Sequence, residues 1–263
     1  MSDDGKARRA SVLLFEKWRA GEKIDAIPQA IRPATREEGY AVQAELMNRT
    51  GSRLFGWKIA ATSEAGQRHI GVDGPLAGRI LEENVRLPSD PISLAGNLMR
   101  VAEVEFAFRF GRRVEPREAL YSVNEVLDAV ESLHPAIEIP DSRYLDFVRV
   151  GAPQLIADDA CAHLFILGAA TGADWRSVDL ARHAVEVRMP DGSLQTGLGS
   201  NVLGDPRVAL AWLVNELSAL GIPLEEGQAV TTGTCIVPIA VKEGDRVAAD
   251  YGPFGTISAH FVA

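Results

Sequence analysis

Two glutamates interrupt the apolar segment Val101-Ala-Glu-Val-Glu-Phe-Ala-Phe108. Successive side chains of a β-strand point to opposite faces, so Glu103 and Glu105 are predicted to share one face of a strand. Two like charges on a half-buried face repel each other and lose hydration. A bound cation would offset both costs. The segment is therefore consistent with a metal site as well as with an ordinary solvated strand face.

A third carboxylate, Glu138, lies in a second apolar run, His134-Pro-Ala-Ile-Glu-Ile139. Taken alone, it also fits an ordinary residue of an edge strand. With the first two glutamates it forms an all-oxygen set on predicted strands, with no cluster of cysteines and histidines nearby. Such a set suits Mg²⁺ or Mn²⁺ better than Zn²⁺.

Composition and charge narrow the possible functions. The chain has 263 residues, enough for one large domain or a main domain with a smaller appendage. Its formal net charge is -9 and it has no basic block, which argues against binding to nucleic acid or to anionic membranes. The apolar runs are shorter than the roughly 18 residues of a membrane span. The start, Met1-Ser-Asp-Asp-Gly-Lys6, is polar and lacks a signal-peptide pattern, so we expect a cytoplasmic protein with Cys161 and Cys235 as buried free thiols.

The order of the predicted elements is that of an α+β fold, with helices early and strands late. Capping residues and apolar periodicity predict five helices, over residues 7–20, Thr35 to Arg49, 63–70, Ser122 to Leu133 and Asp205 to Gly221. Strands are expected around Glu138 and over 54–61, 101–110, 162–167, 184–189, 228–233, 246–250 and 255–262. Residues 71–78 are expected to form a loop, and Pro190-Asp-Gly192 a hairpin turn.

Seven groups of short motifs stand in the order of a known family. They are Gly56-Trp-Lys-Ile-Ala-Ala-Thr-Ser63, Gly71-Val-Asp-Gly-Pro75, Val101 to Phe108, His134-Pro-Ala-Ile-Glu-Ile-Pro-Asp-Ser-Arg143, Ile156-Ala-Asp-Asp-Ala160, Val202-Leu-Gly-Asp-Pro206 with Ala209-Leu-Ala-Trp-Leu213, and Gly244-Asp-Arg-Val-Ala-Ala-Asp-Tyr-Gly252. From about Leu13 to Phe261 the chain resembles the 2-oxopent-4-enoate (2-hydroxypenta-2,4-dienoate) hydratase family. That family also contains 4-oxalocrotonate decarboxylases and belongs to the fumarylacetoacetate hydrolase superfamily.

The resemblance implies a fold, a cofactor and an activity. The fold would be a mixed β-roll with a small helical N-terminal subdomain, divided into an N-terminal α/β part over residues 1–80 and a metal-binding catalytic part over residues 81–263. Glu103, Glu105 and Glu138 would hold Mg²⁺ or Mn²⁺. The implied protein is a homo-oligomeric lyase of aromatic catabolism that adds water to a small 2-hydroxy-2,4-dienoic (2-oxo-4-enoic) acid.

The resemblance also implies an active-site lysine, Lys58. In a strand between Trp57 and Ile59 its ammonium would lose hydration, which is expected to lower its pKa toward the range of an acid–base group. It would then act in proton transfer or pair with the substrate carboxylate. The alternative is a surface lysine at the end of a strand.

The chain departs from the family pattern at Leu76, where hydratases of this family often carry an aspartate that is a candidate proton shuttle. Asp73 and His69 are nearby candidates for catalysis. Asp73 equally fits a turn residue, and an isolated histidine such as His69 is more often structural. A second departure is Asp159, which stands where the family often has asparagine.

Two further residues are candidates for binding substrate. Arg143 would hold the far carboxylate of a dicarboxylate substrate, or pair with Asp141 and stabilise a loop. Thr234 matches a family serine or threonine position near the substrate, and it also fits an ordinary strand hydroxyl.

The residues leave several activities open. Decarboxylation of a 2-oxo dicarboxylate, as in 4-oxalocrotonate decarboxylases, needs no positioned water, so Leu76 suits it. Hydrolysis of a C–C bond in an acylpyruvate needs a water activated near the metal, usually by a Glu/His pair, and His69 is the one candidate seen. A catalytically poor partner subunit is the fourth possibility, and retention of the three glutamates and Lys58 argues against it.

Overall fold

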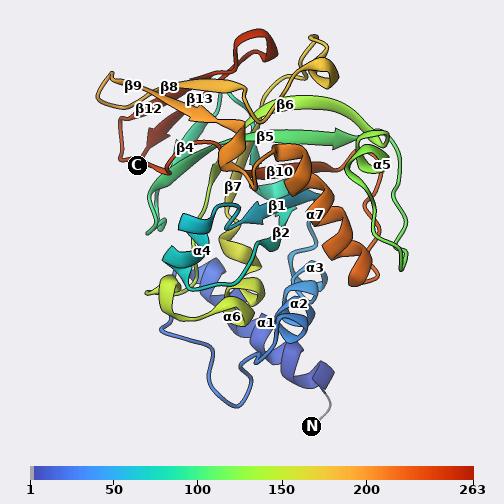
Figure 1. The fold of residues 1–263 in the computed structure, drawn as a ribbon. Coiled ribbons are helices and arrows are strands. Elements are labelled where there is room, and N and C mark those ends of the chain that lie inside the picture. Colours follow the sequence, from blue (N-terminus) through green and yellow to red (C-terminus); the bar gives the residue numbers. More distant parts are fainter. Residues whose placement is uncertain (1–2) are drawn as a thin grey trace.

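The computed structural model describes residues 3–263, which build two β-sheets and a group of helices (Figure 1). The larger sheet has the order β2-β1-β10-β5-β6-β7-β3, and β11 pairs with the far end of β5. Its strands are β1 (Leu54–Ala60), β2 (Leu76–Leu81), β3 (Val85–Arg86), β5 (Val101–Phe110), β6 (Val130–Ile139), β7 (Leu164–Leu167), β10 (Ala229–Thr234) and β11 (Ile239–Ala240). The sheet is mixed, since β10 runs parallel to β1 and antiparallel to β5.

The smaller sheet has the order β4-β13-β12-β8-β9. Its strands are β4 (Pro91–Ser93), β8 (Ala184–Arg188), β9 (Leu194–Leu198), β12 (Arg246–Asp250) and β13 (Thr256–Val262). The predicted turn at residues 190–192 joins β8 to β9 in an antiparallel hairpin. The largest group of buried apolar side chains links β5, the smaller sheet and α7, and it includes Phe106, Val187 and Leu213.

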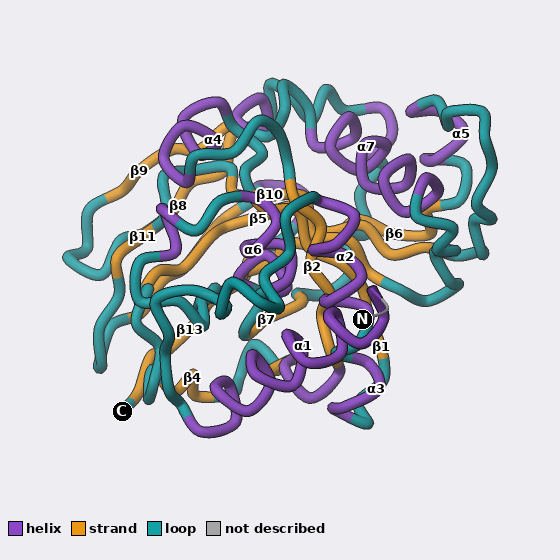
Figure 2. Tube along the Cα trace, turned by 90° about the horizontal axis from the view of Figure 1, so that it is seen from below, coloured by secondary structure: helices purple, strands orange, loops and turns teal. Residues whose placement is uncertain are grey.

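The helices are α1 (Asp3–Ala20), α2 (Arg36–Ala44), α3 (Met47–Thr50), α4 (Glu64–Ile70), α5 (Val123–Leu127), α6 (Ala152–Ala157) and α7 (Pro206–Ala219). α2 packs against both α1 and α6, and Figure 2 shows this group in front of the strands when the molecule is seen from below. α7 packs against β10 and α5. Within residues 3–263, no helix has the length and apolar character that a membrane crossing requires.

The predicted helix starts are confirmed by their caps. The side chain of Thr35 accepts a hydrogen bond from the Glu38 amide, Ser122 and Glu125 form a capping box, and Asp205 accepts from the Arg207 amide. These short polar side chains satisfy amides that have no partner in the first helical turn.

Three predicted boundaries were wrong. The helix that starts after Thr35 stops at Ala44 and is followed by the separate short helix α3. The helix after Ser122 ends at Leu127, because residues from Val130 onward pair with β5. The loop expected over residues 71–78 ends earlier, because residues 76–78 begin the fully buried strand β2.

Glycine explains the error at β2. A Cβ added to Gly78 would lie 2.4 Å from the Asp159 carbonyl oxygen and 2.9 Å from Cδ of Lys58. This glycine therefore permits a close approach of chain segments and does not mark a turn.

The α+β class is as predicted. The proposed boundary between residues 80 and 81 stays a prediction, and β1 and β2 on its N-terminal side pair within the same sheet as β5 and β6.

Candidate metal centre

Three glutamates meet on one face of the larger sheet. Glu103 on β5 stands directly opposite Glu138 on β6 in the antiparallel register, and Glu105 follows two residues along β5 on the same face. Each side chain offers an oxygen atom, and these oxygens lie within 4.8 Å of one another. Glu105 and Glu138 are buried, and Glu103 is partly buried. The alternation of side chains along two paired strands thus brings together the carboxylates that the sequence singled out.

Two of these carboxylates each leave one oxygen without a partner. Among the described residues, the buried polar side-chain atoms that lack a hydrogen bond are Glu105 Oε1, Glu138 Oε2 and Trp57 Nε1. A buried carboxylate oxygen without a partner is costly, because it has lost its water and gained nothing in return. A divalent cation that takes oxygen ligands would satisfy both atoms, so the residues present fit Mg²⁺ or a similar ion.

The other oxygen of Glu105 is held from β10. Thr231 donates a hydroxyl hydrogen bond to Glu105 Oε2, and the Gly233 amide donates to the same atom at 2.8 Å. Gly233 has φ +101°, and a Cβ there would lie 1.9 Å from Oγ1 of Thr62. From the residue just after β12, the Tyr251 hydroxyl donates to the Glu105 carbonyl at 2.7 Å. The orientation of Glu105 is therefore fixed from two sides.

Lys58 lies beside the three glutamates and is only 2% exposed. Its ammonium donates to the Ala160 carbonyl at 2.9 Å and pairs with Glu138 Oε1 at 3.0 Å. The alternative of a surface lysine is excluded. The predicted lowering of its pKa is wrong: burial does lower the pKa of Lys58, but the charges of Glu138 and Glu103 raise it more, so the net shift is upward.

Burial also dominates the carboxylates. It raises the pKa of Glu138 to about 7 although Lys58 lowers it, and it raises the pKa of Glu105 well above the usual range, with repulsion from Glu138 and Glu103 adding to the effect. It raises the pKa of Glu103 as well, against the pull of Lys58. One ammonium thus faces three carboxylates, so a bound cation would reduce the excess of negative charge at the site.

The carbonyl that holds Lys58 belongs to a turn that the sequence did not reveal. Asp159, Ala160 and Cys161 have φ values of 55°, 49° and 63°, so three consecutive residues other than glycine are left-handed. Each such residue costs roughly 1–2 kcal/mol, and a strained turn of this kind persists only where its surroundings fix it. No glycine marks the position, so the sequence carries no signal for it.

The side chain of Asp159 fastens this turn to β2. Its Oδ1 accepts a hydrogen bond from the Arg79 amide at 2.6 Å, and burial raises its pKa to about 7. The turn therefore lies against the same strand whose Gly78 makes room for it and for Lys58.

Comparisons with known proteins place this site in a family. The chain is 33% identical to 2-keto-4-pentenoate hydratase 1 of Dechloromonas aromatica over 259 residues, which cover 96% of this chain and 95% of the relative. The chain belongs to the 2-keto-4-pentenoate hydratase family. The predicted family and its enzymatic character are thereby confirmed. No protein-family model matches the chain.

Solved structures confirm the fold of this hydratase-family chain. It superposes on 4-oxalocrotonate decarboxylase from Pseudomonas putida G7, complexed with magnesium and adipate, with a TM-score of 0.85 at 24% identity over 97% of each chain. A putative fumarylacetoacetate hydrolase family protein from Yersinia pestis gives a TM-score of 0.58 at 14% identity, covering 78% of this chain and 92% of the other. The predicted fold of the fumarylacetoacetate hydrolase type is thus confirmed.

The two other catalytic candidates of this hydratase-family chain lie on its surface. Asp73 is exposed and pairs with Arg36 at 3.6 Å. His69, in the last turn of α4, is exposed, and its ring forms a T-shaped pair with that of Phe147. Neither is among the residues that hold Lys58 or the three glutamates in the described structure, and their catalytic roles stay predictions.

Leu76, the departure from the family pattern, is buried in β2. Its register partner is Ala60, while Gly78 pairs with Lys58. Because side chains two residues apart share a face, Leu76 lies on the same face of the sheet as Lys58. The departure at residue 76 therefore places an apolar side chain on the face that carries Lys58.

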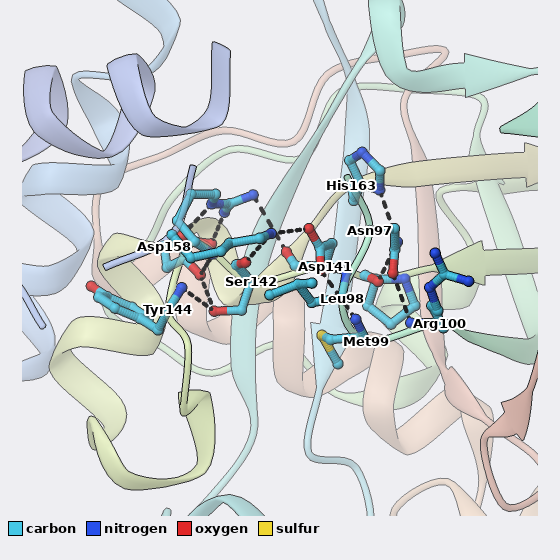
Figure 3. Close-up of polar contacts among 12 residues, drawn as sticks. Asn97, Leu98, Met99, Arg100, Asp141, Ser142, Tyr144, Asp158 and His163 are labelled. Carbon is cyan, nitrogen blue, oxygen red and sulfur yellow. Dashed lines mark hydrogen bonds and ion pairs between the residues drawn. The ribbon is translucent and has the colours of Figure 1, made fainter. Parts of the chain in front are cut away.

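Arg143 is buried and binds within the protein. Its guanidinium pairs with Asp158 rather than with Asp141, so the predicted pairing partner was wrong. Asp141 instead pairs with Lys23 and accepts hydrogen bonds from the amides of Leu98 and Met99. Figure 3 shows Asp141 between Ser142 on one side and Leu98 and Met99 on the other. The substrate-binding role of Arg143 stays a prediction.

Thr234 is the register partner of Glu105 across β10 and β5, and it is partly buried. Its hydroxyl donates to the Ile236 carbonyl at 2.7 Å, so its role toward substrate also stays a prediction. The two cysteines are free and buried, as expected. Burial raises the pKa of Cys161 to about 12, which is that of an unreactive thiol.

Proposed function

We propose that this chain is a divalent-metal-dependent hydro-lyase that adds water to 2-hydroxy-2,4-dienoic (2-oxo-4-enoic) acids in aromatic catabolism. The observation that carries the proposal is the pair of buried carboxylate oxygens without partners, Glu105 Oε1 and Glu138 Oε2, beside the buried ammonium of Lys58. Membership in a family whose relatives are named 2-keto-4-pentenoate hydratases supports the substrate class.

Glu103, Glu105 and Glu138 would hold the ion, with Mg²⁺ or Mn²⁺ as the expected metal. The magnesium and calcium complexes of the structurally similar decarboxylase support an ion of this kind. When bound, the ion would supply coordination for the carboxylate and keto oxygens of the substrate and stabilise negative charge on the keto oxygen.

The protein's own contribution starts with Lys58. Its ammonium is held between Ala160 and Glu138, so its three protons have two fixed acceptors and one direction left over. In that direction it would donate a hydrogen bond to a substrate oxygen and keep its positive charge, because the neighbouring glutamates raise its pKa. Hydration of the dienol needs the 2-hydroxyl to lose a proton as the terminal alkene carbon gains one, which forms the keto group. One water molecule then adds, with its hydroxyl on the neighbouring carbon and its proton on the carbon next to the keto group.

Leu76 favours one second candidate, decarboxylation of a 2-oxo dicarboxylate of the 4-oxalocrotonate type. This reaction releases carbon dioxide from an enolate-forming acid and needs no positioned water. The buried Leu76 on the Lys58 face offers no proton-transfer group for water addition, which is the specific reason to keep this candidate.

The proposal also includes a homo-oligomeric assembly and a cytoplasmic location, as the family resemblance implies. The net charge of -9, without a basic block, supports a partner that is a small acid rather than nucleic acid. Light scattering on the purified protein would determine the number of subunits.

The test is direct. The purified protein with Mg²⁺ or Mn²⁺ is incubated in turn with 2-hydroxypenta-2,4-dienoate, 2-oxohex-3-enedioate and an acylpyruvate, and the products are followed by NMR with and without EDTA. A 4-hydroxy-2-oxo acid that EDTA abolishes is the expected product. Release of carbon dioxide would assign the protein to decarboxylation, and formation of pyruvate with a second acid would assign it to C–C hydrolysis.

A further inference from the structure

Arg143 grips both ends of the left-handed turn. Its Nε pairs with Asp158 Oδ1 and one terminal nitrogen donates to the Asp158 carbonyl, just before the turn. The other terminal nitrogen donates at 3.0 Å to the carbonyl of Ala162, just after the turn. A guanidinium presents several donors in a rigid planar fork, which suits it to fix two points of the backbone at once.

The carboxylate of Asp158 also has a hydrogen-bond partner at each of its oxygens. Its Oδ2 accepts from the Ser142 hydroxyl at 2.6 Å and from the Arg143 amide at 3.0 Å, contacts that Figure 3 shows around Ser142 and Asp158. Asp158 is 1% exposed and Arg143 is 6% exposed. The pair is therefore shielded from water, and both charged groups form hydrogen bonds with the turn and with the segment after β6.

The position of this turn fixes the position of the Lys58 ammonium. Its central carbonyl, that of Ala160, accepts one hydrogen bond of the Lys58 ammonium. The other partner of Lys58 is Glu138, which lies five residues before Arg143 in the chain. The Asp141 amide donates to the Cys161 carbonyl at 2.9 Å, so the segment after Glu138 and the turn are tied together.

We propose that Arg143 and Asp158 are positioning residues, which hold the Ala160 carbonyl and through it the Lys58 ammonium in the geometry that the reaction needs. The turn is strained at three residues, so it depends on an external brace to keep its shape. This inference rests on the proposed function of Lys58. It gives Arg143 a role that acts on the lysine and not on the substrate.

The test compares Arg143→Lys with a matched control, Arg207→Lys. Arg207 also pairs with an aspartate, Asp205, and donates to a backbone carbonyl, that of Val178 at 3.3 Å, but it lies at the start of α7. For each variant we would measure kcat, KM and, by calorimetry, the affinity for Mg²⁺. Peptide mass spectrometry would follow acetylation of Lys58 by an activated ester and alkylation of Cys161 by iodoacetamide.

We expect Arg143→Lys to lower kcat by about tenfold or more, because small displacements of a catalytic group are costly. KM and Mg²⁺ affinity stay close to the wild-type values, and both Lys58 and Cys161 are modified faster. Arg207→Lys leaves all of these quantities unchanged. A raised KM with unchanged kcat and labelling would instead assign Arg143 to substrate binding, and an equal loss of Mg²⁺ affinity would show that it acts through Glu138; either result overturns the proposal.

A milder variant keeps the test decisive if Arg143→Lys does not fold. Ser142→Ala removes the hydrogen bond to Asp158 and the one accepted from the Tyr144 amide, and it leaves the ion pair. Faster labelling of Lys58 and Cys161, with a smaller loss of kcat, supports the brace, and wild-type labelling rates with wild-type kcat refute it. The labelling needs no turnover. A wild-type protein that fails to hydrate dienoates would therefore refute the proposed function while the labelling still decides whether Arg143 braces the turn.

Discussion

Two groups of buried charges, joined by residues 138–143, are built on opposite principles. The first group is the glutamate face, formed by Glu103, Glu105 and Glu138. Its three carboxylates share the one ammonium of Lys58, and two of them each keep an oxygen without a partner. The second group is the brace, formed by Arg143 and Asp158. The two side chains form an ion pair, and both carboxylate oxygens of Asp158 accept hydrogen bonds. The first group has more negative than positive charge, and in the second group each charge has its counter-charge.

The difference shows how a protein keeps ligand binding and structural support in separate groups of charges. A buried charge with no partner destabilises the fold until a ligand supplies one, so it marks a place where binding energy is available. A fully paired buried network holds one geometry and gains nothing from a ligand. Removing a charge should therefore have opposite effects on stability in the two groups.

The largest effect is expected for Glu105→Gln. The variant should lose Mg²⁺ binding and at least about 10²–10³-fold in turnover, while the metal-free protein becomes equally or more stable because a buried charge is gone. Calorimetry with Mg²⁺, product NMR and urea unfolding would measure the three quantities. Glu131→Gln, at an exposed position of β6, is the control and should behave as wild type. Full activity of Glu105→Gln would remove the metal assignment.

Asp158→Asn tests the other half of the comparison. It leaves the buried Arg143 without its counter-charge, and the free energy of unfolding should fall by about 3–5 kcal/mol. The loss should be the same with Mg²⁺ and with EDTA, as measured by urea unfolding. Asp146→Asn, which breaks the exposed pair with Arg149, should change stability by less than about 1 kcal/mol. A loss that Mg²⁺ restores would mean that the two groups are one site.

Metal removal comes next in size. At a free Mg²⁺ concentration about 100 times its dissociation constant, the unfolding free energy of the wild type should exceed that in EDTA by about 2.7 kcal/mol. Asp158→Asn should show the same increment from its lower baseline, and Glu105→Gln should show none. Urea titrations of the three proteins in parallel would measure it. An equal increment in all three would locate the bound ion elsewhere.

The smallest effect is a pH dependence at the edge of the brace. Burial lowers the pKa of His163 to about 4, although Asp141 raises it. The charged groups around the ring are Lys23, Arg86, Asp141 and Arg143. The unfolded chain takes up the proton near pH 6.5 and the folded chain only near pH 4. The stability that a neutral His163 contributes is therefore present above pH 6.5 and is lost as the pH falls toward 4.

Urea unfolding at several pH values between 7 and 5 would measure this loss, which we expect to be about 1–2 kcal/mol over that range. His163→Gln keeps a polar group near Asn97 and should lose less stability over this range than wild type. The buried His134, whose pKa burial also lowers, acts in the same direction in both proteins and cancels in the comparison. Equal slopes for the two proteins would contradict the prediction.

Local rules predicted the glutamate face well. Strand alternation placed Glu103 and Glu105 together, and the caps at Thr35, Ser122 and Asp205 were read from short polar side chains before apolar periodicity. Each of these signals lies within a few residues of the feature that it predicts, so no knowledge of distant segments was needed.

The features that could not be predicted from the sequence all depend on contacts with residues far away in the chain. The pKa of Lys58 rises because Glu138, eighty residues later, lies against it. The left-handed turn at Asp159 to Cys161 contains no glycine and is held by contacts from Arg143. Residues 76–78 of β2 were predicted to be loop, since the reason for Gly78 is the approach of Asp159 and not a bend.

The strand order has a consequence for synthesis on the ribosome. β10, residues 229–234, lies between β1 and β5, so the strands that carry Lys58 and Glu105 are joined into one sheet only when this late segment has been inserted. β10 also supplies Thr231 and Gly233 to Glu105. A nascent chain that has not yet exposed residue 234 therefore lacks a finished centre, and pairing across such separations is slow. Metal capture should then be among the last events in the making of this protein.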